Sequence, residues 1–177
     1  RETYRVEAEA VTAELSDERD LTELIRRIRG RDIRMLVNNA GYRSGSRFHE
    51  DEVENQLRMV QVHVLAAMRL AHAVIPGMLE RRSGAIIQVS SLAAFFPLPR
   101  NVPYCSTKSF LISFSESLHL ELAPFGIAVQ ALCPGFTRTR FHSRMGTPTW
   151  EGFGRKIIWS EPQAVARASL AALGKGK

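Results

Sequence analysis

Tyr104-Cys105-Ser106-Thr107-Lys108 is the stretch of this sequence from which fold and chemistry can be inferred together. If Tyr104 opens a helix, Lys108 lies one turn further along the same face. Pro103 comes just before it, where a fixed φ suits the start of a helix. A tyrosine has a reference pKa of about 10, and a neighbouring ammonium group favours the phenolate. We therefore expect Lys108 to lower the pKa of Tyr104, which would make Tyr104 an acid and base near neutral pH.

Ser91 adds a hydroxyl group to this pair. It lies thirteen residues before Tyr104, at the end of the apolar run Ala85-Ile86-Ile87-Gln88-Val89, and it could hold the same substrate oxygen. Such a set interconverts a carbonyl and an alcohol when another group carries the hydride. A tyrosine and a lysine four residues apart also occur by chance in many helices, where an exposed pair contributes roughly a few tenths of a kcal/mol. Whether Tyr104 and Lys108 form a catalytic set or a chance pair therefore depends on the other motifs of the chain.

Apolar runs typical of buried strands alternate with helical patterns along the whole sequence. This alternation predicts an α/β fold built from βαβ units, with a parallel sheet and helices on both faces. Ser16 or Asp17 is expected to cap the first helix, and Pro76 to bend or split the longest one. The strands are expected over 6–15, 33–37, 85–91 and 127–133, and the helices over 17–30, 51–82, 104–124 and 163–173.

Length and composition indicate one domain over residues 1–177. The formal net charge is +6, but the arginines are scattered and lack stacking aromatics, which does not favour a nucleic-acid partner. The cysteines, Cys105 and Cys133, form no disulfide framework and indicate a reduced, cytoplasmic protein. No apolar run is long enough to cross a bilayer, so no membrane association is expected. The five histidines show no metal-ligand spacing.

In open parallel sheets, ligands bind beyond the carboxyl ends of the strands, and several polar or glycine-containing stretches are expected there. Asn38-Asn39-Ala40-Gly41 offers two amides and two small residues that let a ligand approach the backbone; a plain turn is the alternative. Pro134-Gly135, followed by Thr137 and Thr139, offers hydroxyls and backbone N–H groups; a simple strand stop is the alternative. Residues 14–17 and 90–91 are expected at the same edge.

These motifs resemble, in order and spacing, those of the short-chain dehydrogenase/reductase family in its short single-domain branch. They are Asn38-Asn39-Ala40-Gly41, Val89-Ser90-Ser91, Tyr104-x-x-x-Lys108 and Pro134-Gly135-Phe136-Thr137-x-Thr139. The resemblance covers essentially the whole chain. It implies a Rossmann-like, doubly wound parallel sheet in three α/β/α layers. It also implies hydride transfer between a nicotinamide cofactor and a small-molecule alcohol or carbonyl substrate.

The resemblance also implies roles for single residues. Tyr104 would be the acid and base, Lys108 would lower its pKa while touching the nicotinamide ribose, and Ser91 would position the reacting oxygen. The cofactor-binding residues would be Glu14 near the adenine, Asn38, Ala40, Gly41, Tyr104, Lys108, Pro134, Gly135, Thr137 and, near the carboxamide, Thr139. In the family, the long helix and the helix from Tyr104 form a four-helix bundle between subunits, so a homodimer or homotetramer is expected.

His63 stands where the family has a catalytic asparagine. That asparagine helps to hold a water that relays protons to the lysine, and a histidine could serve as such a relay because its pKa is near neutrality. The alternative is a histidine that packs in the helix with a hydrogen-bond partner. The hypothesis of a catalytic His63 rests on position alone.

The glycine-rich phosphate loop of the family, Gly-x-x-x-Gly-x-Gly after a strand, is absent from this sequence. The family carries it on an earlier βαβ unit, so we expect a domain truncated at both ends. The cofactor would be NAD or NADP. The residues that choose between them belong to the absent unit, and NADP is slightly favoured. Arg43 is interpreted as a solvated loop residue.

Aromatic and apolar residues near the expected site indicate a hydrophobic ketone or alcohol, with ordinary packing as the alternative. They are Phe95, Phe96, Leu98 and, in a region over 136–160 that resembles a substrate lid, Phe136, Phe141, Met145, Trp150, Phe153 and Trp159. Two functions remain open. One is an NAD(P)-dependent oxidoreductase whose full chain is longer. The other is a non-catalytic fragment or pseudoenzyme that associates through its helix-bundle face.

Overall fold

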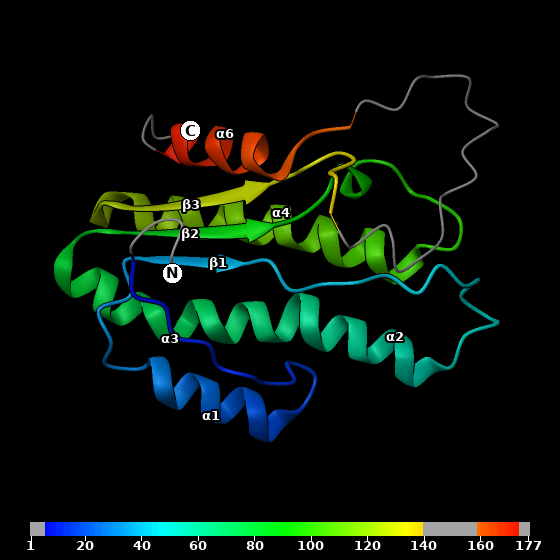
Figure 1. The fold of residues 1–177 in the computed structure, drawn as a ribbon, viewed down its shortest axis with the longest axis horizontal. Coiled ribbons are helices and arrows are strands. Elements are labelled where there is room, and N and C mark those ends of the chain that lie inside the picture. Colours follow the sequence, from blue (N-terminus) through cyan, green and yellow to red (C-terminus); the bar gives the residue numbers. More distant parts are fainter. Residues whose placement is uncertain (1–5, 140–158, 174–177) are drawn as a thin grey trace.

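The computed structural model of the protein describes residues 6–139 and 159–173. Its sheet has three parallel strands, β1 (Met35–Asn38), β2 (Gly84–Val89) and β3 (Ile127–Leu132), in the order β1-β2-β3 (Figure 1). In the register, Leu36 pairs with Ile86 and Ile86 with Val129. Consecutive strands are therefore neighbours joined by helical crossovers, and the predicted α/β fold with a parallel sheet is confirmed.

Helices connect and cover these strands. They are α1 (Glu18–Ile28), α2 (Val53–Val60), the π segment η1 (Gln61–Leu65), α3 (Ala66–Arg81), η2 (Leu92–Ala94), α4 (Val102–Leu122), η3 (Ala123–Phe125) and α6 (Pro162–Leu173). Asp17 caps α1 as predicted, because its side chain accepts hydrogen bonds from the backbone N–H groups of Arg19 and Asp20. The long helix is interrupted at the π segment and not at Pro76, which lies inside α3. A π turn inserts an extra residue and re-aims the side chains around it.

Side chains alternate between the two faces of the sheet. Leu36, Ile86 and Val129 face α3 and α4, and their shared core also contains Ala71, Val74, Met78, Leu122 and Ile127. Helix α1 packs against α3 and Leu36 on this same side. Gln130 points to the opposite face, where it exchanges hydrogen bonds with Ser169 of α6. The predicted three-layer arrangement is therefore present (Figure 1).

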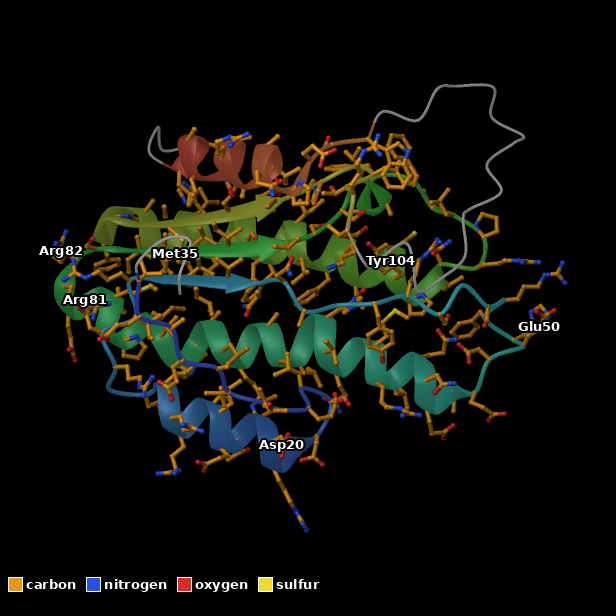
Figure 2. The ribbon with its side chains drawn as sticks, viewed as in Figure 1. Asp20, Met35, Glu50, Arg81, Arg82 and Tyr104 are labelled. Atoms are coloured by element: carbon orange, nitrogen blue, oxygen red, sulfur yellow. The ribbon has the colours of Figure 1, made fainter. Side chains whose placement is uncertain are left out.

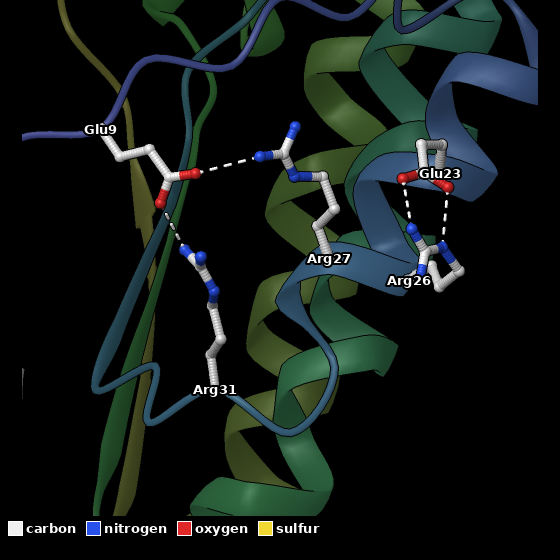
Figure 3. A network of polar contacts seen from close by, with 5 residues as sticks. All are labelled: Glu9, Glu23, Arg26, Arg27 and Arg31. Atoms are coloured by element: carbon white, nitrogen blue, oxygen red, sulfur yellow. Dashed lines mark hydrogen bonds and ion pairs between the residues drawn. The ribbon is translucent and has the colours of Figure 1, made fainter.

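The segment before α1 does not form the strand predicted over 6–15. Residues 6–14 lie outside the three-stranded sheet, and a strand needs a hydrogen-bonded neighbour. The segment instead runs beside α1, where Glu9 pairs with Arg27 at 3.1 Å and with Arg31 at 2.8 Å (Figure 3). Both ion pairs are exposed to solvent, so they hold the segment only weakly.

The helical stretch Val53–Arg81 is 29 residues long and is apolar enough, by length and composition, to cross a membrane. The expectation that no apolar run reaches this length is therefore wrong on those two criteria. The stretch packs on the sheet through Ala71, Val74 and Met78, and it buries the polar side chain of His63. We interpret it as a core helix on this packing.

Candidate active site

Ser91, Tyr104 and Lys108 lie together beyond the carboxyl end of β2. Ser91 caps η2, where its Oγ accepts a hydrogen bond from the N–H of Ala93 at 3.1 Å. Tyr104 and Lys108 are one turn apart near the start of α4, and Figure 2 shows Tyr104 past the ends of the strands. A side-chain hydrogen bond joins Ser91 to the Tyr104 phenol. The structure thus assembles the hydroxyl, the phenol and the ammonium group in one place.

Burial dominates the pKa of Tyr104. It raises this pKa above its ordinary value, while the hydrogen bond with Ser91 and the positive charge of Arg43 lower it. The Lys108 Nζ lies 5.8 Å from the centroid of the Tyr104 ring and donates to the carbonyl oxygen of Val89 at 2.7 Å. The predicted net lowering of the Tyr104 pKa is therefore not found in this structure, because desolvation outweighs the neighbouring groups.

Lys108 is held by both its side chain and its backbone. Its side chain donates to Val89, and its carbonyl oxygen accepts a hydrogen bond from the Ser90 hydroxyl at 2.7 Å. Burial lowers the pKa of the Lys108 ammonium group to about 8, because removing a cation from water favours its neutral form. Two hydrogen bonds therefore tie this turn of α4 to the end of β2.

The loop after β1 comes close to Lys108. Asn38 donates from its amide to the carbonyl oxygen of Ala67 at 3.0 Å and so joins the strand end to α3. A Cβ atom on Gly41 would lie 2.8 Å from Nε2 of His63 and 3.5 Å from Nζ of Lys108. Glycine at position 41 is therefore explained by the close approach of two buried side chains. Ala40, just before it, is exposed.

The residues after β3 contact the loop after β2. The carbonyl oxygen of Pro134 accepts a hydrogen bond from the N–H of Leu92 at 3.0 Å, and a Cβ atom on Gly135 would lie 3.2 Å from Cδ1 of Leu92. Thr137 forms a parallel bridge with Ser160. The Pro134-Gly135 turn thus lies beside the segment that follows Ser91.

Part of the predicted lid lies outside the described residues. Phe141, Met145, Trp150 and Phe153 belong to 140–158, which the structure does not describe. Phe136 and Trp159, on either side of this gap, pack with ring centroids 5.5 Å apart. Thr139 is exposed at the end of the described range.

Glu14 lies on the loop before α1 and is exposed. Its carboxylate accepts hydrogen bonds from the backbone N–H of Ser16 at 3.0 Å and from the Ser16 hydroxyl at 2.8 Å. These bonds lower the pKa of the Glu14 carboxyl group. Burial raises the pKa of Tyr42, and the charge of Glu14 adds to that effect. The charge of Glu14 therefore acts on Tyr42, on the loop after β1, and the proposed place of Glu14 near the adenine stays a prediction.

His63 lies on the π segment and is 1% exposed. Its Nε2 accepts a hydrogen bond from the backbone N–H of Tyr42 at 3.0 Å, and its Nδ1 lies 2.9 Å from Oγ1 of Thr107. An apolar cavity of about 250 Å³ opens beside it, and its lining includes Asn38 and Ala40. The residue predicted at the asparagine position therefore joins the loop after β1 to α4.

Arg43 and Asn101 are residues that the sequence argument missed. The Arg43 guanidinium donates to Oδ1 of Asn101 at 3.2 Å, and Asn101 is the buried residue that precedes α4. Arg43 is thus half-buried beside Tyr104 rather than solvated, so its interpretation as a free loop residue was wrong. The signal that could have revealed it is a cation two residues after Gly41, on a strand end that was already expected to face the site.

No group of three or more potential metal ligands occurs within residues 6–139 and 159–173. The groups assembled at this site could exchange a proton with an oxygen bound beside them. A buried phenol with a hydroxyl partner and a nearby lysine, beyond the strand ends of a parallel α/β sheet, is an arrangement typical of dinucleotide-dependent oxidoreductases. A sequence model described as short chain dehydrogenase matches residues 1–149. The chain therefore belongs to the short-chain dehydrogenase family.

Among curated relatives, the chain is similar to "Inactive hydroxysteroid dehydrogenase-like protein 1" of Homo sapiens, with 32% identity over 99% of this chain and 53% of the relative. It is also similar to "Very-long-chain 3-oxoacyl-CoA reductase" of Anas platyrhynchos, with 29% identity over 98% of this chain and 54% of the relative. The chain spans about half the length of these curated relatives.

Solved structures give the same family. A short-chain dehydrogenase from Sphingobium yanoikuyae in complex with NADPH has a TM-score of 0.85 and 32% identity, covering 96% of this chain and 65% of that chain. The bulky-bulky ketone specific alcohol dehydrogenase from Comamonas testosteroni has a TM-score of 0.83 and 28% identity, covering 99% of this chain and 66% of that chain. The Rossmann-like fold inferred from the motifs is confirmed.

Proposed function

We propose that the protein interconverts a carbonyl and a secondary alcohol by hydride transfer, with NAD or NADP as the cofactor. The observation that carries the proposal is the hydrogen-bonded pair of Ser91 and Tyr104 with Lys108 one turn further along α4. Tyr104 would act as the acid and base, and Ser91 would hold the substrate oxygen. Both groups lie where ligands bind in open parallel sheets.

The residues present fit the nicotinamide half of such a cofactor. Gly41 lets the backbone of the loop after β1 come close to Lys108 and His63, and Pro134-Gly135 places a second glycine-containing turn at the end of β3. When bound, the nicotinamide supplies or accepts the hydride. NADP is the cofactor to test first, because the solved structure from Sphingobium yanoikuyae is described as a complex with NADPH.

The direction of the Tyr104 pKa bears on the direction of the reaction. Because burial raises this pKa, Tyr104 stays protonated at neutral pH, which is the form that donates a proton to a carbonyl oxygen as an alcohol is made. In the reverse direction, the phenolate would take the hydroxyl proton while the carbonyl forms. Ser91 would donate a hydrogen bond to the same oxygen in both directions. The raised pKa therefore favours carbonyl reduction at neutral pH.

The substrate is proposed to be hydrophobic. Phe95 and Phe96, between η2 and α4, are 56% and 63% exposed, and Leu92 is 48% exposed. These apolar side chains follow Ser91 directly, so a bound ketone could cover them. The names of two similar proteins, one specific for bulky-bulky ketones and one for very-long-chain 3-oxoacyl-CoA, agree with a large apolar substrate.

The alternative function is a non-catalytic protein that associates through its helices. One observation favours it, since a relative matched over 99% of this chain is named inactive. Against it, the chain carries Ser91, Tyr104 and Lys108 with the hydroxyl and the phenol in contact. Exposed apolar residues of the helices, including Val53, Leu57 and Met68, support a homodimer or homotetramer under either function. A cytoplasmic location is also proposed, on the basis of the free cysteines.

The experiment is a pair of measurements on the full-length protein. NADPH and NADH are titrated by nicotinamide fluorescence, and turnover is followed at the nicotinamide absorbance with a bulky aromatic ketone and a long-chain 3-oxoacyl thioester. We expect binding of at least one cofactor and turnover that falls by about 10²–10⁴-fold in Tyr104→Phe, with cofactor affinity retained. Cofactor binding without any turnover would support the non-catalytic alternative, whereas equal turnover in Tyr104→Phe would overturn the role of Tyr104 as the acid and base.

A further inference from the structure

His63 lies between the two parts of the site and contacts both. Its ring meets the ring of Tyr42 edge-on, with centroids 5.9 Å apart and an interplanar angle of 74°. It meets the ring of Tyr104 in the same way, at 5.9 Å and 75°. Tyr42 follows Gly41 on the loop after β1, whereas Tyr104 belongs to α4. The imidazole therefore fills the space between the proposed cofactor loop and the proposed acid.

The hydrogen bonds around His63 determine which ring nitrogen carries the proton. Nε2 accepts from the backbone N–H of Tyr42 at 3.0 Å, so it has no proton of its own. The Thr107 hydroxyl has one hydrogen, which it donates to the carbonyl oxygen of Tyr104 at 3.0 Å. Thr107 Oγ1 must therefore accept from Nδ1 of His63, at 2.9 Å. This network selects the neutral imidazole with its proton on Nδ1.

The surroundings oppose a second proton on this ring. A proton on Nε2 would point at the N–H of Tyr42, and two donors cannot share that contact. Burial and the nearby Lys108 charge lower the pKa of His63 to about 3. Tyr42 and Tyr104, which face the ring on either side, both have raised pKa values and so stay neutral near pH 7. A neutral His63 with both nitrogens engaged cannot pass a proton onward without breaking the contacts that hold it.

We propose that His63 is a positioning residue that joins the loop after β1 to the Tyr104–Lys108 turn of α4, and that it does not relay protons. One hydrogen bond holds the loop at Tyr42, and the other reaches Thr107, which in turn holds the carbonyl of Tyr104. The catalytic meaning of this inference rests on the proposed function. His63 lies on the π segment Gln61–Leu65. Because a π turn re-aims the side chains around it, this segment helps to direct the imidazole between Tyr42 and Thr107.

The first test is an NMR measurement of the His63 ring nitrogens in the full-length protein. A neutral, tautomer-locked ring gives one protonated and one unprotonated nitrogen, with Nδ1 protonated, and these signals stay unchanged between pH 5 and 7, below the pKa of about 8 at which the nearby Lys108 loses its charge. A His63 signal that titrates across this range, or a proton found on Nε2, would overturn the proposal. This measurement needs no substrate, so it decides the inference even if the protein shows no turnover and the proposed function fails.

The second test uses variants that each keep half of the connection. In His63→Asn the amide can still donate to Thr107, and in His63→Gln the amide oxygen can still accept from Tyr42; His63→Leu keeps neither bond. We expect turnover to fall about 10-fold in each half variant and about 100-fold in His63→Leu, because small misplacements of reacting groups carry costs of this size. The midpoint of the pH–rate profile should not move, because a neutral group replaces a neutral group.

Two further variants test the same connection, Thr107→Val as a second break in it and His119→Asn as the control. Thr107→Val removes the acceptor for Nδ1, so its loss of turnover should not add to that of His63→Gln in a double-mutant cycle. His119→Asn is the control, since His119 also lies on α4 but accepts from the N–H of Val129 at 3.4 Å, on β3. Full turnover in His63→Leu would contradict the proposal, as would a limb of the pH profile that disappears in all three His63 variants and not in His119→Asn.

Discussion

Two regions of the molecule are held by different kinds of contact. The first region is the site around Tyr104, made of the start of α4 and the loop after β1, and the second is the segment before α1. Around Tyr104 the contacts are buried hydrogen bonds, made by residues such as Lys108 and His63 that are 5% and 1% exposed. Before α1 they are exposed ion pairs of Glu9 and local hydrogen bonds of Glu14. Breaking a buried polar contact leaves an unsatisfied group, whereas an exposed pair is screened by water and salt. The geometry of the site should therefore depend on the first region and very little on the second.

Gly41→Ala should give the largest effect in the first region. The added Cβ would lie 2.8 Å from Nε2 of His63, and His63 cannot move without losing its bonds to Tyr42 and Thr107. We expect the free energy of unfolding to fall by about 1–3 kcal/mol, the usual cost of overpacking a buried site. Cofactor affinity should fall as well, because the same loop borders Lys108. Urea unfolding and NADPH titration measure the two effects.

Gly77→Ala is the matched control for this substitution. Gly77 lies inside α3, and its Cβ would meet only the far end of the long Arg81 side chain, with Nη1 at 3.1 Å, so a shift of a few tenths of an ångström would relieve the contact. Replacing a glycine inside a helix by alanine stabilises by roughly 0.5–1 kcal/mol. Similar losses of stability in both variants would show that the contact between Gly41 and His63 is not special.

The sequence was sufficient to predict the first region in outline. The spacing of Tyr104 and Lys108, the apolar run before Ser91 and the small residues at 40–41 all concern neighbours within one element or at a strand end. Local periodicity and the rule for strand ends determine such features. The bounds of β1, β2, β3 and α4 were accordingly predicted to within a few residues.

Contacts between distant elements could not be predicted in the same way. Arg43 meets Asn101 across 58 positions of the chain, and His63 meets Thr107 across 44, and no local pattern encodes either pair. The net pKa direction of Tyr104 failed for the same reason, since desolvation depends on everything packed around the phenol. The segment 6–15 was misassigned because its composition suits a strand, while a strand also requires a neighbouring strand.

Arg43→Gln should give an intermediate effect and a clear direction. Glutamine can still donate a hydrogen bond to Asn101, but it removes the charge that lowers the pKa of Tyr104. The pKa of Tyr104 should therefore rise further, and the pH at which alcohol oxidation reaches half of its maximal rate should move upward. The pH–rate profile of oxidation measures this shift, and Arg43→Lys, which keeps the charge, should restore most of it.

Arg47→Gln is the control for charge alone. Arg47 lies on the same loop but pairs with Glu50 at 3.2 Å, and both side chains are more than half exposed. Its removal should leave the pH profile where it was. An equal shift in Arg43→Gln and Arg47→Gln would mean that the general charge of the loop acts on Tyr104, and the contact between Arg43 and Asn101 would lose its significance.

Glu9→Gln should give the smallest effect, because it acts in the second region. It breaks the ion pairs with Arg27 and Arg31, which solvent and salt already weaken. We expect no resolvable change in Tm or turnover at physiological salt. The comparison variant is Asp32→Asn, which breaks two ion pairs of 3.1 Å. One is with the exposed Arg34, and the other, which is not aligned as a hydrogen bond, is with the less exposed Arg81. Asp32→Asn should lower Tm more than Glu9→Gln, since the Arg81 guanidinium also holds the carbonyl oxygen of Ile33. The reverse order would show that the segment before α1 contributes to the stability of the fold, and the distinction between the two regions would fail.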